Sequence, residues 1–501
     1  MIAAPTTTPA GDWGRLLAPA AAAAVLLLGI GTSGQPIACA ARPPQPTAPS
    51  PQPARSGTRA TAPSPVLRRQ LLILPAEVDV LAGGGLLSRL PRPPGAVEIG
   101  WLVGRVPAAW LSGGGGQAVT VTSEILVGRG GTLAIGPATR RLRLGGGADP
   151  AEAAGISADG GELTITGTTV TADDSGGTGS VTGSVTGSEA GLPWLAVGGG
   201  GRVDVRDSQL VGLAGGSAAG PRGAALYLGP GATGSVVRTT VTGAGTGLVL
   251  AGTRSVVLDA VTVRGSAGTG IVLRAEVGNT LTGVTSADNG ADGVAIAGTP
   301  GRRITGLRTA RNQRHGILAV GLRDLLLTDV RSTDDATALE LDACQRCVVE
   351  DVGVDGGGSG VRVGAGSRLV EVDGGAVTGA GVGVWMAAAV SDVTVNNLAV
   401  VGAGDTGVLL CGVRPSLTGA AVTSMGMGVE VCEGAADVQI ASSTVRVRET
   451  AGWAGGSAPT AAPAREAGSP PLAARCPPAG PIPAFPGASP GWQRCVDGAW
   501  L

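Results

Sequence analysis

The sequence predicts an all-β solenoid, a coil of two or three short strands per turn in which each turn stacks in parallel on the one before. Three observations support this fold class. A phrase Gly-aliphatic-x-aliphatic recurs along the chain, and a second apolar run follows each phrase after about ten residues. No repeat unit contains an uninterrupted helical pattern of apolar residues.

The recurring phrase defines the period of the coil. Its starting positions give successive spacings of 23, 23, 23, 22, 22, 23, 24 and 21 residues, at Gly247, Gly270, Gly293, Gly316, Ala338, Gly360, Gly383, Gly407 and Gly428. A leucine-rich repeat has a similar period but needs a leucine frame and a helical return leg, whereas a propeller blade is about twice as long. We therefore expect a solenoid of ~22–24 residues per coil.

The second apolar run of each unit also has the character of a strand. Examples are "SVVLDAVTV" (255–263), "RDLLLTDV" (323–330) and "DVQIASSTVRV" (437–447). These runs alternate between apolar and polar residues and are rich in Val and Thr, which is typical of strands. Clusters of glycine and Asp or Asn separate the runs, and such clusters indicate turns.

Stacking of the coils assigns each residue of the phrase to a face. Strands in a sheet lie ~4.8 Å apart, so equivalent residues of successive coils should lie directly above one another. The first and third residues after the phrase glycine should face inward, and they are apolar in every unit from Leu248 and Leu250 to Val429 and Val431. The second residue should face outward, which gives the column Val249, Val272, Ala295, Leu318, Glu340, Arg362, Trp385, Leu409 and Glu430.

This pattern resembles the right-handed parallel β-helix family, the pectate-lyase-like superfold. The resemblance is clear from about residue 225 to 450, and "GELTITGTTVTA" and "GRVDVRDSQLVG" extend it toward residue 116. We assign residues 116–450 to the β-helix. Residues 66–115 are expected to form an N-terminal cap, because an open solenoid end exposes core side chains and strand edges.

The two ends of the chain differ in composition from the repeats. Arg15 precedes the apolar run 16–30, and Ala38-Cys39-Ala40 offers a small-x-small cleavage site, so residues 1–40 are predicted to be a signal peptide. The alternative is an uncleaved anchor, although the run is short for a spanning helix of ~20 residues. Residues 41–65 form a Pro-rich linker and residues 451–501 a Pro-rich, disulfide-containing tail. We expect a secreted or cell-envelope-associated protein with no membrane insertion after cleavage.

The cysteines test the register of the coils. Cys411 and Cys432 each lie four residues after a phrase glycine, so they should lie on adjacent coils. That stacking matches the Cα separation of ~4.4–6.8 Å in disulfides, and we predict a Cys411–Cys432 bond.

The other cysteines form two further candidate pairs. Cys344 and Cys347 form a C-x-x-C motif. A single histidine and the lack of a second such motif argue against zinc, and no thioredoxin-like context indicates a redox site, so a local disulfide is favoured. Cys476 and Cys495 are then expected to pair in the tail.

Charge excludes one class of partner. The net charge is −1, all 36 basic residues are arginine, and aromatic residues make up 2% of the chain. No basic strip interleaved with aromatic residues occurs, so nucleic acid is not an expected partner. The sequence does not indicate an oligomeric state.

The single histidine marks a candidate catalytic group. His315 directly precedes Gly316, and Asp292 holds the same position one coil earlier, so these two side chains should stack. With Arg314 and Asp335 they could abstract a proton from a uronate sugar while arginine neutralises the substrate carboxylate.

Two other interpretations of this region remain open. Asp288 and Asp334, together with Asp292, offer oxygen ligands of the kind that calcium prefers; no other cofactor is expected. Alternatively, the region is a charged, hydrogen-bonded turn, in which the column Ser266, Asn289, Asn312 and Asp334 forms a ladder of side-chain hydrogen bonds.

The resemblance extends in part to enzymes of the superfold. "NQRHGI" (312–317) is similar to the Asn-x-x-His-Gly-Ile stretch of mannuronan-epimerase-like members, but their Asp-Pro-His-Asp motif is absent. Polygalacturonase-like members carry paired aspartates one coil before His-Gly, whereas here Asp334 and Asp335 come after it. Pectate lyases use a lysine, and this chain has none.

Three outward residues on consecutive coils suggest a ligand surface. Glu340, Arg362 and Trp385 could form a sugar-stacking platform; the alternative is ordinary surface decoration. We therefore expect a protein that binds extended polysaccharide. The alternatives are a lyase or C5-epimerase acting on uronate glycans, which leaves open whether the protein is an enzyme, and a structural spacer or adhesin.

Overall fold

The computed structural model describes residues 68–114, 117–146, 153–173, 191–214, 222–298 and 301–447, together with residues 495–496 and 499–500. The predicted signal peptide, the linker and most of the tail, including Cys476, lie outside these residues, so their boundaries stay predictions. Among the described residues, no helix is long and apolar enough to cross a membrane.

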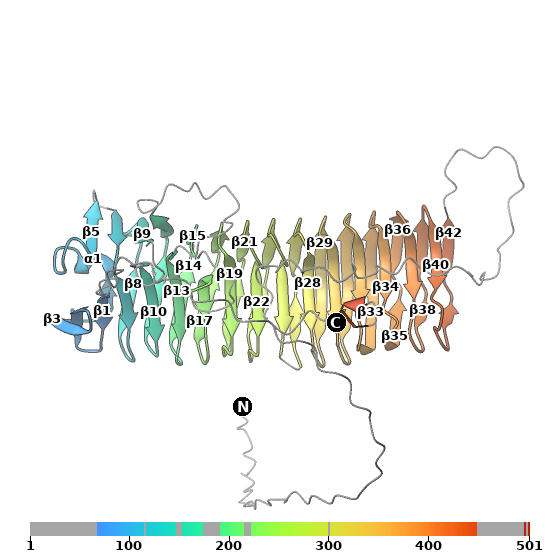
Figure 1. Ribbon diagram of the computed structural model, residues 1–501, viewed down its shortest axis with the longest axis horizontal. Coiled ribbons are helices and arrows are strands. Elements are labelled where there is room, and N and C mark those ends of the chain that lie inside the picture. Colours follow the sequence, from blue (N-terminus) through green and yellow to red (C-terminus); the bar gives the residue numbers. More distant parts are fainter. Residues whose placement is uncertain are drawn as a thin grey trace, which may run out of the picture. The chain divides into compact units, whose positions relative to one another are not determined.

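Each coil is built from strands joined by tight corners. One turn consists of β10 (Gly155–Asp159), β11 (Glu162–Thr166) and β12 (Thr169–Asp173). Gly160 and Gly167 turn the chain between them with φ of 68° and 62°, a left-handed conformation that glycine adopts without steric penalty. Each of the three strands pairs in parallel with its equivalent on the next coil (Figure 1).

The first sheet runs along the whole stack. Its 16 strands are, in order, β3 (Gly85–Pro91), β2 (Glu77–Ala82), β1 (Arg69–Ile73), β7 (Glu124–Val127), β10, β13 (Trp194–Gly198), β16 (Ala224–Leu228), β19 (Thr246–Ala251), β22 (Ile271–Arg274), β25 (Val294–Ala297), β28 (His315–Val320), β30 (Thr337–Asp342), β32 (Ser359–Val363), β34 (Val382–Met386), β37 (Thr406–Leu410) and β40 (Met427–Val431).

The second sheet is shorter. Its seven strands are β23 (Thr280–Thr282), β20 (Val256–Asp259), β17 (Thr233–Val237), β14 (Arg202–Arg206), β11, β8 (Thr132–Ile135) and β4 (Val97–Glu98).

The third sheet contains the remaining strands of the stack, which pair in parallel except for β5, the antiparallel partner of β6. They are β5 (Leu111–Gly114), β6 (Ala118–Val121), β9 (Arg141–Gly145), β12, β15 (Gln209–Val211), β18 (Thr240–Thr242), β21 (Thr262–Arg264), β24 (Thr285–Ala287), β26 (Arg303–Thr305), β27 (Arg308–Ala310), β29 (Leu326–Thr333), β31 (Val348–Asp355), β33 (Arg368–Thr378), β35 (Ser391–Asn396), β36 (Ala399–Ala403), β38 (Ser416–Thr418), β39 (Ala421–Ser424), β41 (Gln439–Ala441) and β42 (Thr444–Val447). Separately, β43 (Cys495–Val496) and β44 (Ala499–Trp500) pair antiparallel.

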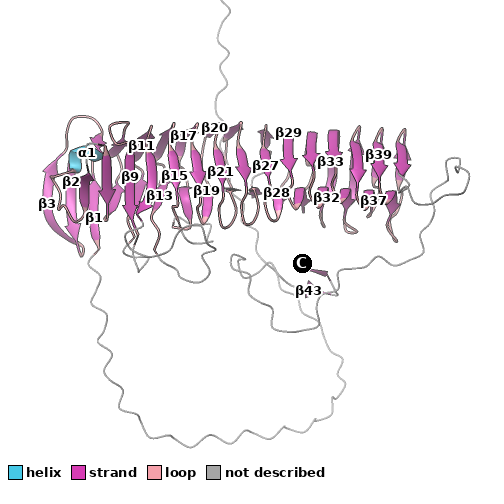
Figure 2. Cartoon of the chain, turned by 90° about the horizontal axis from the view of Figure 1, so that it is seen from above, coloured by secondary structure: helices cyan, strands magenta, loops and turns pink. Residues whose placement is uncertain are grey.

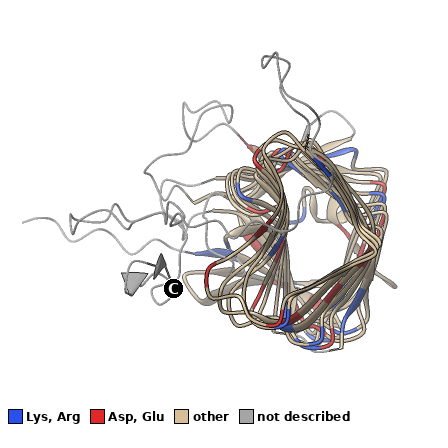
Figure 3. Ribbon diagram, turned by 90° about the vertical axis from the view of Figure 1, so that its right-hand side faces the viewer, with Lys and Arg blue, Asp and Glu red and all other residues tan. Residues whose placement is uncertain are grey.

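The stacked coils confirm the predicted solenoid, a right-handed parallel β-helix. Viewed along the stack, successive coils superimpose (Figure 3). Leu248 pairs with Ile271, Ile271 with Val294, and Val294 with Ile317, which is the predicted inward column. These side chains are at most 1% exposed and belong to one continuous apolar core.

The N-terminal end of the stack is covered by the chain itself. The strand β1 pairs in parallel with β7 on one side and antiparallel with β2 on the other. The short helix α1 (Ile99–Leu102) places Ile99 and Leu102 against the core, where both are 0% exposed. Figure 2 shows α1 and β1–β3 together at this end.

A buried ladder of polar side chains holds neighbouring coils in register. The Oδ1 atom of Asn312 accepts from the backbone N–H of Asn289 at 3.1 Å and from its amide group at 2.8 Å. One coil further, Asp335 accepts in the same way from the backbone and the amide of Asn312, both at 2.8 Å. The sequence predicted this ladder at Asn289 and Asn312 but wrongly continued it to Asp334.

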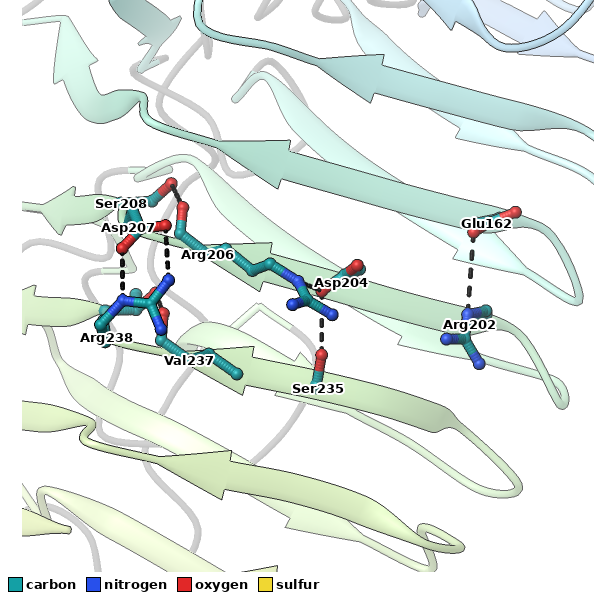
Figure 4. A network of polar contacts seen from close by, with 10 residues as sticks. Glu162, Arg202, Asp204, Arg206, Asp207, Ser208, Ser235, Val237 and Arg238 are labelled. Atoms are coloured by element: carbon teal, nitrogen blue, oxygen red, sulfur yellow. Dashed lines mark hydrogen bonds and ion pairs between the residues drawn. The ribbon is translucent and has the colours of Figure 1, made fainter. Parts of the chain in front are cut away.

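Ion pairs between coils occur at two exposed corners, one between the second and third sheets and one between the third and first sheets. Asp207 accepts from Arg238 on the next coil at 2.6 and 2.8 Å, and Asp288 accepts from Arg311 at 2.7 and 3.0 Å. All four residues have positive φ between 43° and 56°. Figure 4 shows the first pair beside the Arg206–Asp204–Ser235 network. Exposed pairs of this kind add little stability each, so they chiefly favour one register.

The predicted Cys411–Cys432 disulfide is present, with a Cα–Cα separation of 4.9 Å. The predicted Cys344–Cys347 disulfide is absent, because both residues are free thiols that are 0% exposed. Cys344 and Cys347 occupy the positions that Leu322 and Leu325 hold on the preceding coil. They fill these core positions as small hydrophobic side chains. A hydrogen bond with Cys347 and burial raise the pKa of the Cys344 thiol.

The ladder leads to a first prediction. Asn312→Ala should destabilise the protein by ~2–4 kcal/mol, since it removes the shared acceptor of the buried Asn289 backbone N–H and amide, and one donor to the buried Asp335 carboxylate. The matched control is Asn396→Ala, because Asn396 donates to Glu371 at 3.1 Å in an exposed position; its effect should stay within ~0.5 kcal/mol. Equal unfolding free energies of the two variants in urea would contradict the structural role of the ladder.

A second prediction concerns the thiols. Peptide mapping without reductant should recover Cys411 and Cys432 as a linked pair. Cys344 and Cys347 should react with an alkylating reagent only after unfolding, because neither is accessible in the folded chain. Recovery of a Cys344–Cys347 link from the folded protein would show that the core is oxidised in solution.

Candidate functional site

The candidate site lies on the outward face of the first sheet. Pairing between strands places Leu318, Glu340, Arg362 and Trp385 in one column, on β28, β30, β32 and β34. The sequence predicted this column. Side chains along a strand alternate between the two faces, so the residue between two core positions points outward.

His315 lies between two carboxylates from neighbouring coils. Its Nδ1 is 2.7 Å from Oδ1 of Asp292, and its Nε2 is 2.8 Å from Oε2 of Glu340. The three side chains are 14%, 6% and 11% exposed, in the order His315, Asp292 and Glu340. With both ring nitrogens facing acceptors, the doubly protonated imidazolium can donate to both carboxylates. We call these three residues the His315 cluster.

The charges of the His315 cluster stabilise one another. Burial acts to lower the pKa of His315, but hydrogen bonds and charges from Asp292 and Glu340 outweigh burial and raise the pKa to about 9. Burial likewise acts to raise the pKa of Glu340, but the hydrogen bond from His315 and the charge of Arg362 bring it below its ordinary value. At neutral pH His315 is therefore protonated and positively charged.

Two arginines border the cluster. Arg362 Nη1 lies 3.4 Å from Oε2 of Glu340, and its guanidinium carbon lies 4.5 Å from the centroid of the Trp385 ring. The Nε of Arg362 is buried and has no hydrogen-bond partner among the described residues. Arg314 is more exposed, with its Nε 3.8 Å from Oδ1 of Asp292. Arg362 thus joins the His315 cluster to the aromatic ring.

One carboxylate near the cluster was missed in the sequence. Asp342 ends β30, two residues after Glu340 on the same outward face, and is half-buried. Burial, and then the charge of Glu340, raise its pKa. The spacing of two residues from Glu340 on one strand was the signal that could have identified it.

Asp335 does not belong to the site. It is 1% exposed and accepts hydrogen bonds from Thr309, at 2.6 Å, and Ser332, at 2.7 Å, within the ladder. The sequence placed it beside His315, but the coil between Gly316 and Ala338 has 22 residues, and the shortening brings Asp335 under Asn312. Its carboxylate faces the interior, where it cannot reach a substrate.

The predicted calcium ligands are also dispersed. Asp288 forms an ion pair with Arg311 at an exposed corner between the third and first sheets, and Asp334 holds a turn position with φ of 53°. Within the described ranges, no group of three or more His, Cys, Asp or Glu side chains is arranged to hold a metal ion. The stacking of Asp292 on His315, in contrast, is confirmed.

The geometry limits the chemistry of the site. A general base needs an unprotonated group with a pKa near the working pH, and His315 holds its proton to about pH 9. The Arg362–Trp385 pair instead offers guanidinium donors and an indole, both suited to sugar hydroxyls and ring faces. The arrangement is better suited to binding than to proton abstraction at neutral pH.

A third prediction rests on the raised pKa of His315. The stabilisation that protonated His315 provides is fully present below its unfolded value near 6.5 and is lost as pH rises through about 9. The unfolding free energy of the wild type should therefore fall between pH 6 and 9.5 relative to His315→Gln, by up to ~3 kcal/mol. Urea unfolding of both proteins across this range measures the difference. His315 is the only histidine, so no other imidazole contributes; parallel curves would refute the assignment.

Comparisons with known proteins agree with the fold. Residues 224–400 match the family model described as the right handed beta helix region. A search of curated proteins found no match. Among solved structures, the periplasmic alginate epimerase AlgG is similar at 15% identity and a TM-score of 0.46, over 70% of this chain and 83% of that one.

Two further solved structures are similar at lower scores. The polygalacturonase from Erwinia carotovora ssp. carotovora has 12% identity and a TM-score of 0.30, over 65% of this chain and 90% of its own. The A-module of the Azotobacter vinelandii mannuronan C-5 epimerase AlgE6 has 12% identity and a TM-score of 0.26, over 66% and 91%. At these identities and scores, the similarities do not assign a role to any residue of the site.

Proposed function

We propose that this chain, whose residues 224–400 match the family model described as the right handed beta helix region, is an exported protein that binds an extended polysaccharide of the cell envelope or surroundings. The binding surface would be the outward face of the first sheet around β30, β32 and β34. Successive strands there present side chains at a spacing of ~4.8 Å, so a long ligand can contact several coils at once.

The observation that supports this proposal best is the stacking of Arg362 on Trp385 at 4.5 Å from the ring centroid. The stacked guanidinium keeps donors available for sugar hydroxyls, while its position is fixed by the ring on one side and by Glu340 on the other. A preordered arginine loses less side-chain entropy on binding than a mobile one.

The charge balance of the surface bears on the type of polysaccharide. Asp292, Glu340 and Asp342 carry acidic groups, and His315, Arg314 and Arg362 carry basic groups. These charges nearly cancel, so the surface has no strong field that would select a highly anionic polymer. Hydrogen bonding to hydroxyl groups would then account for most of the recognition.

An enzyme is the second candidate, supported by the hydrogen bond between His315 and Asp292 on the outward face. A lyase or C5-epimerase acting on uronate glycans would use His315 for proton transfer. Since its pKa is about 9, such activity should rise steeply from neutral pH toward pH 9. Release of unsaturated uronate that disappears in His315→Ala would establish the lyase reaction, and inversion at C5 that disappears in the same variant would establish epimerisation. A purely structural spacer would show neither activity nor glycan binding.

The fourth prediction tests the binding surface. A glycan array probed with the purified chain should identify a bound polysaccharide, and Trp385→Ala and Arg362→Ala should each weaken its affinity by about tenfold or more. Arg238→Ala is the matched control, because Arg238 is an exposed, ion-paired arginine at a corner outside the first sheet. Equal affinities of all three variants would place binding elsewhere, and the absence of any bound glycan would remove the proposal.

A further inference from the structure

The C-terminal end of the β-helix exposes its core. In the last described coil, the inward residues of the three strands remain accessible: Val431 is 42% exposed, Ile440 46% and Val445 43%. Their paired residues one coil earlier are all 0% exposed, namely Leu410, Leu417 and Val422. Val431, Ile440 and Val445 are thus aligned with core residues of the preceding coil, but no further coil covers them among the described residues.

The strand edges at this end are open as well. β40, β41 and β42 each pair with the preceding coil, and within the described ranges no strand pairs with their other edge. Met425 and Met427 add apolar surface there, at 51% and 48% exposure. A row of unpaired backbone groups next to exposed core residues is a template for another strand.

The chain supplies a candidate to cover this end. After Val447 it continues for 54 residues, 448–501. This segment holds four of the ten aromatic residues of the whole chain, which has eight Trp, one Tyr and one Phe. The four are Trp453, Phe485, Trp492 and Trp500. Large apolar side chains spaced along a segment rich in Pro, Gly and Ala are suited to insert into an exposed apolar surface.

We propose that the C-terminal segment 448–501 packs across the open end of the β-helix as an intramolecular cap. Its aromatic residues would cover Val431, Ile440 and Val445, and part of its backbone would pair with an open edge of the last coil. Its final residues already include a short antiparallel pair, β43 and β44. The proposal is independent of polysaccharide binding, since the last described coil, with β40, lies two coils beyond β34 and Trp385.

A second copy of the chain is the competing occupant, since two open ends could pair with each other. The segment is favoured because it leaves the body at Val447, directly beside the surface to be covered, which gives it a high effective concentration there. The N-terminal end shows the same solution, because Ile99 and Leu102 of this chain close it from within.

The test uses hydrogen exchange of peptides from residues 427–447 in the full chain. Trp492→Ser together with Trp500→Ser should speed exchange in these peptides by about tenfold, although the last coil is unchanged. The matched control in the same segment is Gln493→Ser, which should leave exchange as in the wild type. Unchanged exchange in the tryptophan variant would overturn the proposal.

A second variant probes the covered surface. Val445→Lys should speed the same exchange and increase tryptic cleavage at Arg465 and Arg475. The reason is that the lysine would place a charge in the proposed apolar contact between the last coil and the C-terminal segment. The control is Val277→Lys, at an exposed valine of 65% accessibility in the middle of the stack. If Val445→Lys behaves as the control, the end is uncovered. If it instead dissociates a dimer in sedimentation, a second copy is the occupant; either result overturns the cap.

Discussion

The register between coils is the constraint on which the rest of this structure depends. Each coil must return to the same position one strand spacing further along, so that core residues such as Leu248, Ile271 and Val294 form one column. Apolar packing alone specifies this register weakly, because the core would accept many aliphatic combinations. The ladder of Asn289, Asn312 and Asp335 specifies it strongly, because buried polar groups tolerate only the alignment that satisfies them.

The sequence was sufficient to predict the features that periodicity determines. Two periods, that of the coil and that of the strand, decide which residues face inward and which residues stack. The Cys411–Cys432 disulfide and the stacking of Asp292 on His315 both result from counting from a phrase glycine, and both are present. The outward column through Glu340, Arg362 and Trp385 is obtained in the same way.

The sequence could not reveal where a coil gains or loses a residue, nor how far a side chain reaches. The coil of 22 residues after Gly316 is shortened in the turn, which puts Asp335 rather than Asp334 in the ladder. Counting residues back from the phrase glycine does not show in which part of the coil the residue is missing. The contact between Glu340 and His315 joins different columns, so it depends on side-chain conformation. Cys344 and Cys347 looked like a local motif, yet their positions in the core columns of Leu322 and Leu325 explain them as packing residues.

The His315 cluster shows how charge pairing restricts function. Three ionisable side chains that are less than a sixth exposed contact one another there, and a buried charge without a partner is strongly destabilising. For His315 to act as a base, it would have to give up a proton that two carboxylates hold. Arg362 is under less restriction, because its contact with Glu340 is long, at 3.4 Å, and its side chain, stacked on Trp385, is 35% exposed. A ligand that accepts hydrogen bonds would therefore gain most at Arg362, with the His315 cluster acting as the rigid support that holds Glu340, and through it the arginine, in place.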